Sequence, residues 1–515
     1  MQIFIGCVAL TMKRANLMQV CRLNQSHIKR ACYAGTERKG AAMTRDMQTL
    51  IDEYLAANWE TMLADYAALI EIPSVEDLDA ATPGAPFGPE PARALDAALG
   101  IAARMGLEAH NCEGYIGVAD LPGASPAQIG IIGHVDVVPA GPGWHFEPYA
   151  LTRKDGYLVG RGIIDDKGPI ITALHAVNLF KQNGIELPYT LRMMFGANEE
   201  TNMKDVKYYL EHYEEPAFLF TPDAEFPVSY GEAGIMGGLF TSKRITDGVI
   251  VDIAGGVAMN AVPGEAHAVV RARAADLASK DAHITVTDAG ADADGRPLAR
   301  IDVAGKSAHA STPELGVSAI RVLVDYLLMN DLCSYEEKQF LMLERAFLRA
   351  TNGEGLNIAC SDEHFGALTA VGGIIAMKDG CITQTLDARY PTCTSADAIA
   401  AEIRVYTDII DATFEVLYDK KPFLLDKQSP AVEALLAAYR EATGEAGAEP
   451  FTMKGGTYAR CFKNAASFGP EKPWVAMPEW AGGMHGPDET ASEESLKEAF
   501  RIYALTIDKL MELEW

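Results

Sequence analysis

The chain has 515 residues, of which 49% are hydrophobic and 22% charged, so we expect an ordinary globular protein with more than one domain. Its formal net charge of −27 argues against nucleic acid or an anionic membrane as a partner, because both attract clustered Lys and Arg. No apolar run approaches the roughly 18 residues that a membrane-spanning helix needs. The nine cysteines include no CxxC pair, which indicates neither a disulfide framework nor a thiolate zinc site and favours a reducing cytoplasm.

The first 46 residues differ from the rest of the chain. Residues 1–45 contain eight Lys or Arg but only one acidic residue, Glu37, and they show no clear helical or strand period. A secretory signal places positive charge ahead of its apolar segment, whereas "MQIFIGCVALTMKR" has the apolar part first. We expect residues 1–46 to be a disordered extension, or sequence that lies upstream of the native start.

From Leu50 to about Ile72 apolar residues recur at helical spacing, and "IPSVED" then interrupts the pattern. Apolar strands that end in polar residues follow, and they alternate with amphipathic helices. The strands are expected at 127–138, 189–200 and 216–226, and the helices at 166–184 and 202–215. Strands separated by helices of this length are typical of βαβ units. We therefore predict an α/β fold with a mainly parallel sheet flanked by helices.

The pattern changes between residues 237 and 423, where strands and turn signals mix with helical stretches near 316–330 and 395–410. We interpret this segment as an α+β domain inserted into the first domain. Within it, "DAGADADG" at 288–295 resembles a calcium loop but lacks the glutamate at position 12, so we expect a hairpin turn.

The chain then returns to the first domain, which would comprise residues 47–236 and 424–515. "SPAVEALLAAYREATG" predicts a capped helix at 429–444. "GGTYARCF" is a glycine-rich loop, and a final helix is expected from about Glu493.

Polar side chains follow three of the predicted strands and precede one predicted helix. They are His134, Asp136, Glu199, Glu200 and Asp223 at the strand ends, and Asp165 and Asp166 before the helix. In an open parallel sheet, ligands gather at the carboxyl ends of the strands. Taken singly, the histidine could bond to backbone and the adjacent glutamates could lie in solvent at a helix start. Together they would crowd so many anions into one crevice that cations are needed to neutralise them.

The number of carboxylates predicts two divalent metal ions rather than one. Each catalytic metal takes about three protein ligands and keeps a position open for water, and a bridging carboxylate can serve both ions. One carboxylate is then left over. We interpret one glutamate of the Glu199–Glu200 pair as a ligand and its neighbour as a general base, although spacing alone does not say which is which.

Four motifs support a more specific interpretation. "GHVDVVP", "GRGIIDDKGP", "NEE" and "TPDAEFPV", in this order, resemble metallopeptidase family M20, and "DDKGP" with "TPDAEFPVSYGE" resembles its PepV-type dipeptidase branch. The resemblance runs from about residue 47 to the C-terminus. It implies a zinc-peptidase-like catalytic domain and makes the inserted segment, residues 237–423, a lid.

The resemblance also implies a role for each site residue. His134, Asp165 and Asp223 would bind one metal, Asp165 would bridge, and Glu200 and His485 would complete the second site. Glu199 matches the general base, and Asp136 matches the carboxylate that orients the His134 ring. In relatives, the peptide bond that matches Asp165–Asp166 is cis.

The lid and a neighbouring loop would supply the contacts with the substrate. His309 matches a histidine that stabilises the oxyanion, and Asn260 matches an asparagine that contacts the substrate. Arg389 matches the arginine that holds the terminal carboxylate through its planar fork, although an ion pair with Asp387 is the alternative. Gly455, Gly456 and Thr457 match a loop close to the substrate. The tryptophan-rich "EKPWVAMPEWAGGMH" departs from the pattern.

We therefore predict a dinuclear metal-dependent dipeptidase in which Glu199 activates a metal-bridging water. The alternatives are an N-acyl-amino-acid amidohydrolase or a carboxypeptidase on the same core, and a non-catalytic binding protein, against which the complete ligand set argues. Two divalent ions are expected, Zn²⁺ first, with Mn²⁺ or Co²⁺ also suited to these ligands. The inserted segment is longer than one small lid would need, and it resembles the enlarged lid of PepV-type enzymes, which covers the site from the same chain. We therefore expect an active monomer.

Overall fold

The structure is a computed structural model that describes residues 46–277 and 279–515. The predicted N-terminal extension therefore lies outside the described residues, apart from Asp46. No helix in the described ranges is long and apolar enough to cross a membrane. The α-helices of this part of the chain are α2 (Met47–Ile70), α3 (Pro89–Arg104), α4 (Lys167–Gln182), α5 (Lys204–His212), α6 (Ala319–Met329), α7 (Tyr335–Leu348), α8 (Ala396–Ile409), α9 (Pro430–Thr443) and α10 (Glu493–Leu510).

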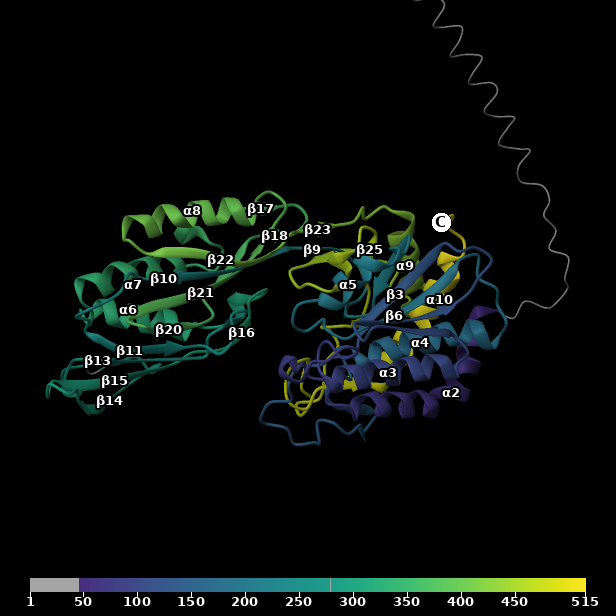
Figure 1. Cartoon of the computed structure of the whole chain (residues 1–515), viewed down its shortest axis with the longest axis horizontal. Coiled ribbons are helices and arrows are strands. Elements are labelled where there is room, and N and C mark those ends of the chain that lie inside the picture. Colours follow the sequence, from purple (N-terminus) through teal and green to yellow (C-terminus); the bar gives the residue numbers. More distant parts are fainter. Residues whose placement is uncertain (1–45, 278) are drawn as a thin grey trace, which may run out of the picture. The chain divides into compact units, whose positions relative to one another are not determined.

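The first of two large sheets contains the strands that were predicted to alternate with helices (Figure 1). Its four central strands, β6, β3, β7 and β25, are parallel. The outer strands pair antiparallel on both sides, except β24, which pairs in parallel with β9. The sheet thus has the predicted parallel centre, with antiparallel additions. In spatial order its strands are β1 (Glu108–Cys112), β2 (Ile116–Leu121), β6 (Thr190–Gly196), β3 (Gln128–His134), β7 (Phe218–Thr221), β25 (Ala465–Ser467), β9 (Ser229–Glu232) and β23 (Phe423–Leu424), with β24 (Phe451–Met453) beside β9.

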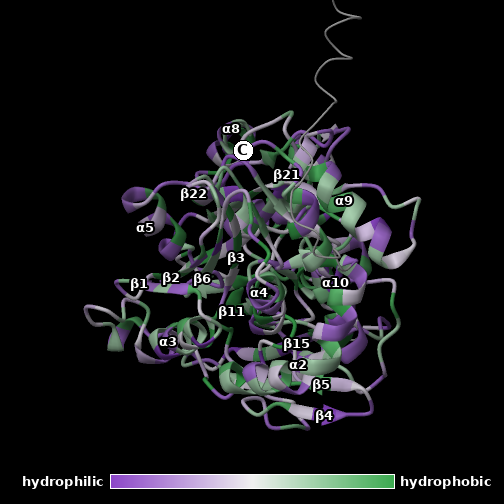
Figure 2. Ribbon diagram, turned by 90° about the vertical axis from the view of Figure 1, so that its right-hand side faces the viewer, coloured by the Kyte–Doolittle hydropathy of each residue, from purple (hydrophilic) through white to green (hydrophobic). Residues whose placement is uncertain are grey.

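Helix α4 is the central helix against this sheet. Every residue from Lys167 to Phe180 is buried, and Figure 2 shows α4 in the middle of the view. It packs against the strands β3 and β6 and against the helix α10. Because α4 begins directly after Asp165 and Asp166, the packing of this helix fixes the position of both carboxylates.

The second sheet is built from the inserted segment, and its strand pairs are antiparallel. Helices α6, α7 and α8 contribute to one apolar core with it, which includes Phe240, Leu323 and Phe347. In order the strands are β14 (Ile284–Ala291), β15 (Pro297–Ala304), β13 (Glu265–Val270), β11 (Ile250–Gly255), β20 (Ile375–Lys378), β21 (Cys381–Tyr390), β10 (Gly234–Thr241) and β22 (Thr413–Lys420), with β19 (Thr369–Val371) beside β21.

Short strands complete the fold. Residues 288–295 form the tip of the β14–β15 hairpin, as predicted. The remaining strands pair as β27 (Thr490–Ser492) with β5 (Tyr157–Val159) and β4 (Thr152–Lys154), β12 (Ala261–Val262) with β16 (Ala308–His309), β26 (Pro470–Glu471) with β8 (Ala224–Glu225), and β17 (Ser361–Asp362) with β18 (Gly366–Ala367).

The α/β fold with an inserted α+β segment is the predicted class. The chain leaves the first sheet after β9 and enters the second with β10, so it crosses at Ala233. It returns between β22 and β23, at residues 421–422. The predicted boundaries at 236/237 and 423/424 lie close to these crossings, and the division into domains stays a prediction.

Candidate metal centre

The carboxyl ends of three parallel strands bring the predicted residues to one edge of the first sheet. β3 ends at His134, β6 ends three residues before Glu199, and β7 ends two residues before Asp223. Since β3 pairs in parallel with both β6 and β7, these ends meet at the same edge. The sequence pattern of apolar strands that end in polar residues therefore predicted this juxtaposition correctly.

His134 is fully buried, and the carboxyl groups of Asp136, Asp165 and Asp223 surround its ring; these residues, with Glu199, Glu200 and His485, form one cluster. Its Nε2 lies 2.8 Å from Asp165 Oδ1 and 3.8 Å from Asp223 Oδ2. Its Nδ1 lies 3.0 Å from the backbone oxygen of Asp136 and 3.4 Å from the Oδ1 of the same residue. Asp136 thus holds the Nδ1 edge of the ring, while Nε2 lies next to the carboxylates of Asp165 and Asp223.

Asp165 connects His134 to the C-terminal part of the chain. Its Oδ2 lies 2.9 Å from His485 Nε2, and the same nitrogen lies 3.1 Å from Glu200 Oε2. Burial alone would raise the pKa of Asp165, but hydrogen bonds from both histidines hold it below its usual range. The peptide bond that follows Asp165 is cis, as the resemblance implied. The five predicted ligands are therefore linked to one another, Asp223 through His134 and Glu200 through His485.

Two groups of side chains within the described ranges could each hold a metal ion. In each group the ligand atoms lie within 4.8 Å of one another, and His134 belongs to both groups. One group adds Glu199 and Asp223 to His134, and the other adds Asp165 and Glu200. Imidazole and carboxylate are donors that suit Zn²⁺, Mn²⁺ and Co²⁺.

The electrostatics of the cluster fit bound cations. Burial raises the pKa of Glu199 to about 8, and the carboxylates of Glu200 and Asp165 contribute to this rise. Burial and Asp165 also raise the pKa of Asp223 well above its usual value. Hydrogen bonds to Asp165 and Glu200 raise the pKa of His485 to about 11. Protons thus neutralise crowded carboxylates here, and divalent ions at the same positions would do so more completely.

Backbone hydrogen bonds hold the two adjacent glutamates in place. The Asp136 carboxylate accepts from the N–H of Glu199 at 3.2 Å and of Glu200 at 3.1 Å. The carboxylate predicted to orient the His134 ring therefore also fixes the loop that carries Glu199. Both contacts come from a buried Asp136, two residues beyond the end of β3.

Asp166 lies behind the cluster. It is fully buried, its Oδ2 accepts from the His134 N–H at 3.1 Å, and its Oδ1 has no hydrogen-bond partner among the described residues. A Cβ at position 133 would lie 2.1 Å from Asp166 Oδ2, which explains the glycine before His134. Burial raises the pKa of Asp166 well above its usual value.

Two of the predicted lid residues lie next to each other. β12 pairs with β16 so that Ala261 is opposite His309, and the backbone oxygen of Asn260 accepts from the Ala310 N–H at 2.9 Å. Both Asn260 and His309 are exposed, and His309 Nδ1 lies 2.7 Å from Ser311 Oγ. The short ladder thus presents an imidazole and an amide together.

Arg389 lies on β21 and is paired with a carboxylate of its own strand. Its Nε and Nη2 donate to the two oxygens of Asp387 at 2.6 and 3.0 Å, and its Nη1 donates to the Lys454 backbone oxygen at 3.0 Å. Both side chains are buried. The ion pair that the sequence left open as an alternative therefore exists, and it orients the guanidinium.

Thr457 anchors the glycine-rich loop through hydrogen bonds to the buried Glu232. Its Oγ1 donates to Glu232 Oε1 at 2.6 Å, and its N–H donates to the same carboxylate. Glu232 also lies 2.9 Å from Arg460 Nε. Gly456 lies against Arg460, where a Cβ would approach Nη1 to 2.8 Å, and Gly455 lies against Met453. These contacts explain the loop's small residues.

Sequence reasoning did not single out Asp205. It is fully buried in α5, and its Oδ2 accepts from the N–H groups of Ala197 and Asn198 and from the Tyr458 hydroxyl. It thereby holds the segment that leads to Glu199. The signal available in the sequence was an acidic residue in the first turn of the helix that follows "NEE".

The tryptophan-rich segment is held by aromatic packing. The Trp480 ring lies 5.8 Å from Phe146 and 5.7 Å from Tyr157, and Lys154 Nζ lies 4.3 Å from its centre. This contact places the segment before His485 against β4 and β5. Trp474, by contrast, is 56% exposed.

Comparisons with known proteins identify the family of the chain. The sequence model of peptidase family M20/M25/M40 matches residues 130–509. A β-Ala-Xaa dipeptidase of Lactobacillus delbrueckii subsp. lactis is 31% identical over 475 residues, which are 89% of this chain and 97% of that protein. The chain therefore belongs to peptidase family M20/M25/M40, as its motifs indicated.

Solved structures show the same fold. The crystal structure of human carnosine dipeptidase 1 has a TM-score of 0.55 at 14% identity and covers 91% of this chain and 99% of its own. The dipeptidase Dug1p of Saccharomyces cerevisiae has a TM-score of 0.53 at 13% identity, with coverage of 91% and 99%. At these identities the likeness concerns the fold.

Proposed function

We propose that this protein is a dipeptidase that uses two divalent metal ions. The observation that carries the proposal is the convergence of His134, Asp165, Glu200, Asp223 and His485, with Glu199 beside them. The similar β-Ala-Xaa dipeptidase supports dipeptides as the substrate class. An N-acyl-amino-acid amidohydrolase or a carboxypeptidase on the same core is the runner-up.

His134, Asp165 and Asp223 would hold one ion, and Asp165, Glu200 and His485 the other. Bound there, the two ions would lower the pKa of a water molecule and polarise the scissile carbonyl. Zn²⁺ is the proposed metal, and Mn²⁺ or Co²⁺ would suit the same donors. Asp136 holds the His134 ring, so the protein orients this ligand before any metal arrives.

Glu199 is the proposed general base. Its backbone is fixed by Asp136, and its carboxylate belongs to the cluster without being needed as a ligand in this scheme. It would accept a proton from the attacking water and pass it to the leaving amine. Burial and neighbouring carboxylates favour the protonated form of Glu199. The positive charge of two bound ions would favour the ionised form that a general base needs.

The inserted segment would complete the site as a lid. His309 would stabilise the negative charge that develops on the carbonyl oxygen, and Asn260 beside it would contact the substrate. Arg389 would bind the terminal carboxylate through the N–H groups of Nη1 and Nη2 that are not taken by Asp387 and the Lys454 backbone oxygen. Closure of the lid would also exclude water from the reaction.

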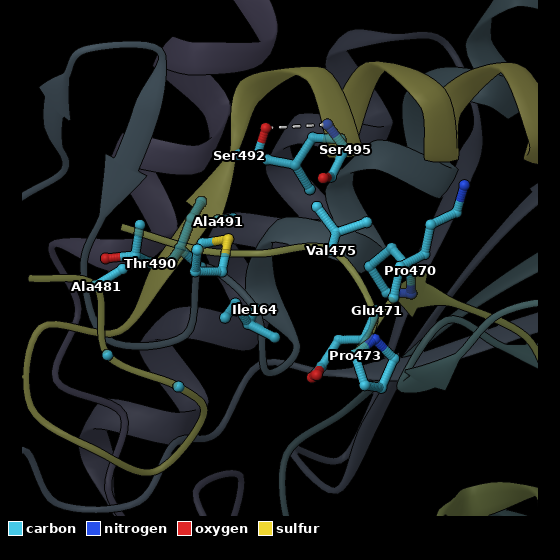
Figure 3. A pocket seen from close by; sticks show the side chains of 16 residues that line it. Ile164, Pro470, Glu471, Pro473, Val475, Ala481, Thr490, Ala491, Ser492 and Ser495 are labelled. Atoms are coloured by element: carbon cyan, nitrogen blue, oxygen red, sulfur yellow. Dashed lines mark hydrogen bonds between the residues drawn. The ribbon is translucent and has the colours of Figure 1, made fainter. Parts of the chain in front are cut away.

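Two carboxylates near the cluster favour a substrate with a free amino group. Glu225 and Glu471 are neighbours across the β8–β26 ladder, and Glu225 lies two residues beyond Asp223. Neither forms an ion pair with any other described residue. Glu471 lines a cavity of about 220 Å³ that also contacts Ile164, next to Asp165 (Figure 3). Burial raises the pKa of Glu471 to about 8. A peptide ammonium, unlike an N-acyl group, would stabilise the ionised form of this carboxyl group, so the arrangement would favour dipeptides over N-acyl amino acids.

A substrate panel tests the proposal. The protein loaded with Zn²⁺, Mn²⁺ or Co²⁺ would be assayed with free dipeptides, the same dipeptides with an acetylated amino end, and N-acetyl amino acids. We expect kcat/KM to be highest for free dipeptides. Higher kcat/KM for the N-acetyl compounds would favour the amidohydrolase, and no hydrolysis of any compound would favour a binding protein.

A further inference from the structure

Arg161 and Glu489 form a buried ion pair behind the predicted ligands. Arg161 Nη1 lies 2.6 Å from Glu489 Oε2, and the side chains are 1% and 0% exposed. Arg161 precedes Asp165 by four residues, and Glu489 follows His485 by four residues. The pair therefore joins the two loops that carry Asp165 and His485.

Glu489 holds the loop of Asp165 through its backbone. Its Oε1 accepts from the N–H of Gly162 at 3.1 Å, of Ile164 at 2.9 Å and of Asp165 itself at 3.3 Å. The Glu489 backbone oxygen also accepts from the Gly160 N–H at 3.0 Å. The last turn before the Asp165 carboxylate is thus fixed by one side chain.

Arg161 holds the loop of His485 in the same way. Its Nη2 donates to the backbone oxygen of His485 at 3.2 Å and to that of Ala140 at 3.3 Å. Ala140 lies in the loop that follows His134 and Asp136. The guanidinium therefore connects the loop of Ala140 with the loop of His485. Its Cζ lies 5.3 Å from the centre of the Trp144 ring.

We propose that Arg161 and Glu489 are positioning residues that set the separation of Asp165 and His485 and thereby control metal affinity. The inference rests on the proposed function, since it concerns how this chain presents metal ligands. Neither side chain belongs to the two groups of side chains that could hold a metal ion, so each would act through the backbone of a loop that carries a ligand. The pair would fix the Asp165 and His485 loops before an ion binds.

The chemistry of Glu489 explains why a carboxylate is needed. All of its partners donate, namely three N–H groups and a guanidinium. A carboxylate can accept from all of them, whereas an amide of the same shape carries an NH₂ group that would face other donors. Glu489→Gln should therefore preserve volume and disturb the hydrogen bonds of the Asp165 loop.

Zn²⁺ affinity is the measurement that separates positioning from folding. Chelator-stripped wild type, Glu489→Gln and Arg161→Lys would each be titrated with Zn²⁺ against a competing chromophoric chelator. Unfolding midpoints would be recorded for the same samples. For Glu489→Gln we expect the affinity of at least one site to fall about 10- to 100-fold, the range typical for partners that orient metal ligands. Arg161→Lys keeps the charge but loses the contact with His485, so its affinity should fall less.

Asp65→Asn is the matched control. Asp65 is also a buried carboxylate that accepts from an arginine and another side chain, Arg104 and His175, but it lies on α2 and contacts α4 through His175. This variant should lose stability and keep its Zn²⁺ affinity within about twofold of wild type, a difference of roughly 0.4 kcal/mol.

The outcomes separate the two proposals. Unchanged Zn²⁺ affinity in both Glu489→Gln and Arg161→Lys would overturn the positioning role while leaving the metal centre intact. An equal loss in Asp65→Asn would also overturn it, because the effect would then be one of general stability. If Glu489→Gln does not fold, the Zn²⁺ affinity of Arg161→Lys alone decides whether the pair has a positioning role. A wild type that binds no Zn²⁺, Mn²⁺ or Co²⁺ would instead refute the metal centre itself.

Discussion

Asp136 and Glu199 are joined by a hydrogen bond from the Glu199 N–H to Asp136 Oδ1 at 3.2 Å, although 63 residues separate them. The same carboxylate accepts from the Glu200 N–H, and Asp205 accepts from the two residues before Glu199. The loop that carries the adjacent glutamates is thus fixed by buried carboxylates on both sides. The side chains of Glu199 and Glu200 can therefore take different roles while the backbone of the loop stays in place.

The first prediction concerns this division of roles. Glu199→Gln should retain both metal ions and lower kcat about 10²- to 10⁴-fold, because it removes a proton acceptor but no proposed ligand. Glu200→Gln should lower kcat and also weaken one metal site, since Glu200 lies beside His485. Metal content and kcat would be measured on the same preparations. Equal metal loss in the two variants would contradict the assignment.

The second prediction concerns the lid. We expect His309 to act on the site of its own chain and a monomer to be active. His309→Ala and Glu199→Gln should each be nearly inactive, and an equimolar mixture should remain so. Recovered activity in the mixture would show that the histidine is supplied by a second copy. Sedimentation of the wild type at assay concentration would accompany the test.

The third prediction concerns a buried acid in α7. Glu344 is fully buried, and neither carboxylate oxygen has a hydrogen-bond partner among the described residues. Burial raises the pKa of Glu344 well above its usual value near 4.5. The folded state therefore binds this proton more tightly than the unfolded state. Below the pKa that Glu344 has in the unfolded chain, this group does not reduce the free energy of unfolding. As the pH rises from there towards the pKa in the folded protein, the free energy of unfolding falls by about 1.4 kcal/mol for each pH unit.

Replacement of Glu344 tests that sign. Glu344→Gln removes the ionisation and nearly preserves volume, so the variant should unfold at higher denaturant concentration than wild type at pH 7.5. The difference should shrink towards pH 4.5. A variant that is less stable than wild type at neutral pH, with an unchanged difference at low pH, would show that the carboxyl group is paired.

The sequence predicted those parts of the fold that depend on local pattern. Strands with polar ends located His134, Glu199 and Asp223, and α9 begins and ends at its predicted Ser429 cap and Gly444. Two helices, α3 and α7, were not predicted. The signal for α7 was present, because Ser334 and Glu337 form a capping box of the S-x-x-E type.

The anchoring residues could not be predicted in the same way. Arg161, Asp205, Glu232 and Glu489 are charged residues that are usually exposed, and only the tertiary structure shows that they are buried. Each has a hydrogen-bond partner distant in sequence, which is a backbone group for Arg161, Glu232 and Glu489 and the Tyr458 hydroxyl for Asp205. Local pattern contains no information on such pairings, whereas ligand motifs recur because metal chemistry restricts their residue types.

The most direct test of the account is metal content measured together with dipeptide hydrolysis on one preparation. Purified protein should contain up to two divalent ions per chain, chelation should abolish turnover, and re-addition of Zn²⁺, Mn²⁺ or Co²⁺ should restore it. His134→Ala and Asp165→Ala should each lower bound metal. A metal-free preparation with full dipeptidase activity would contradict the central claim.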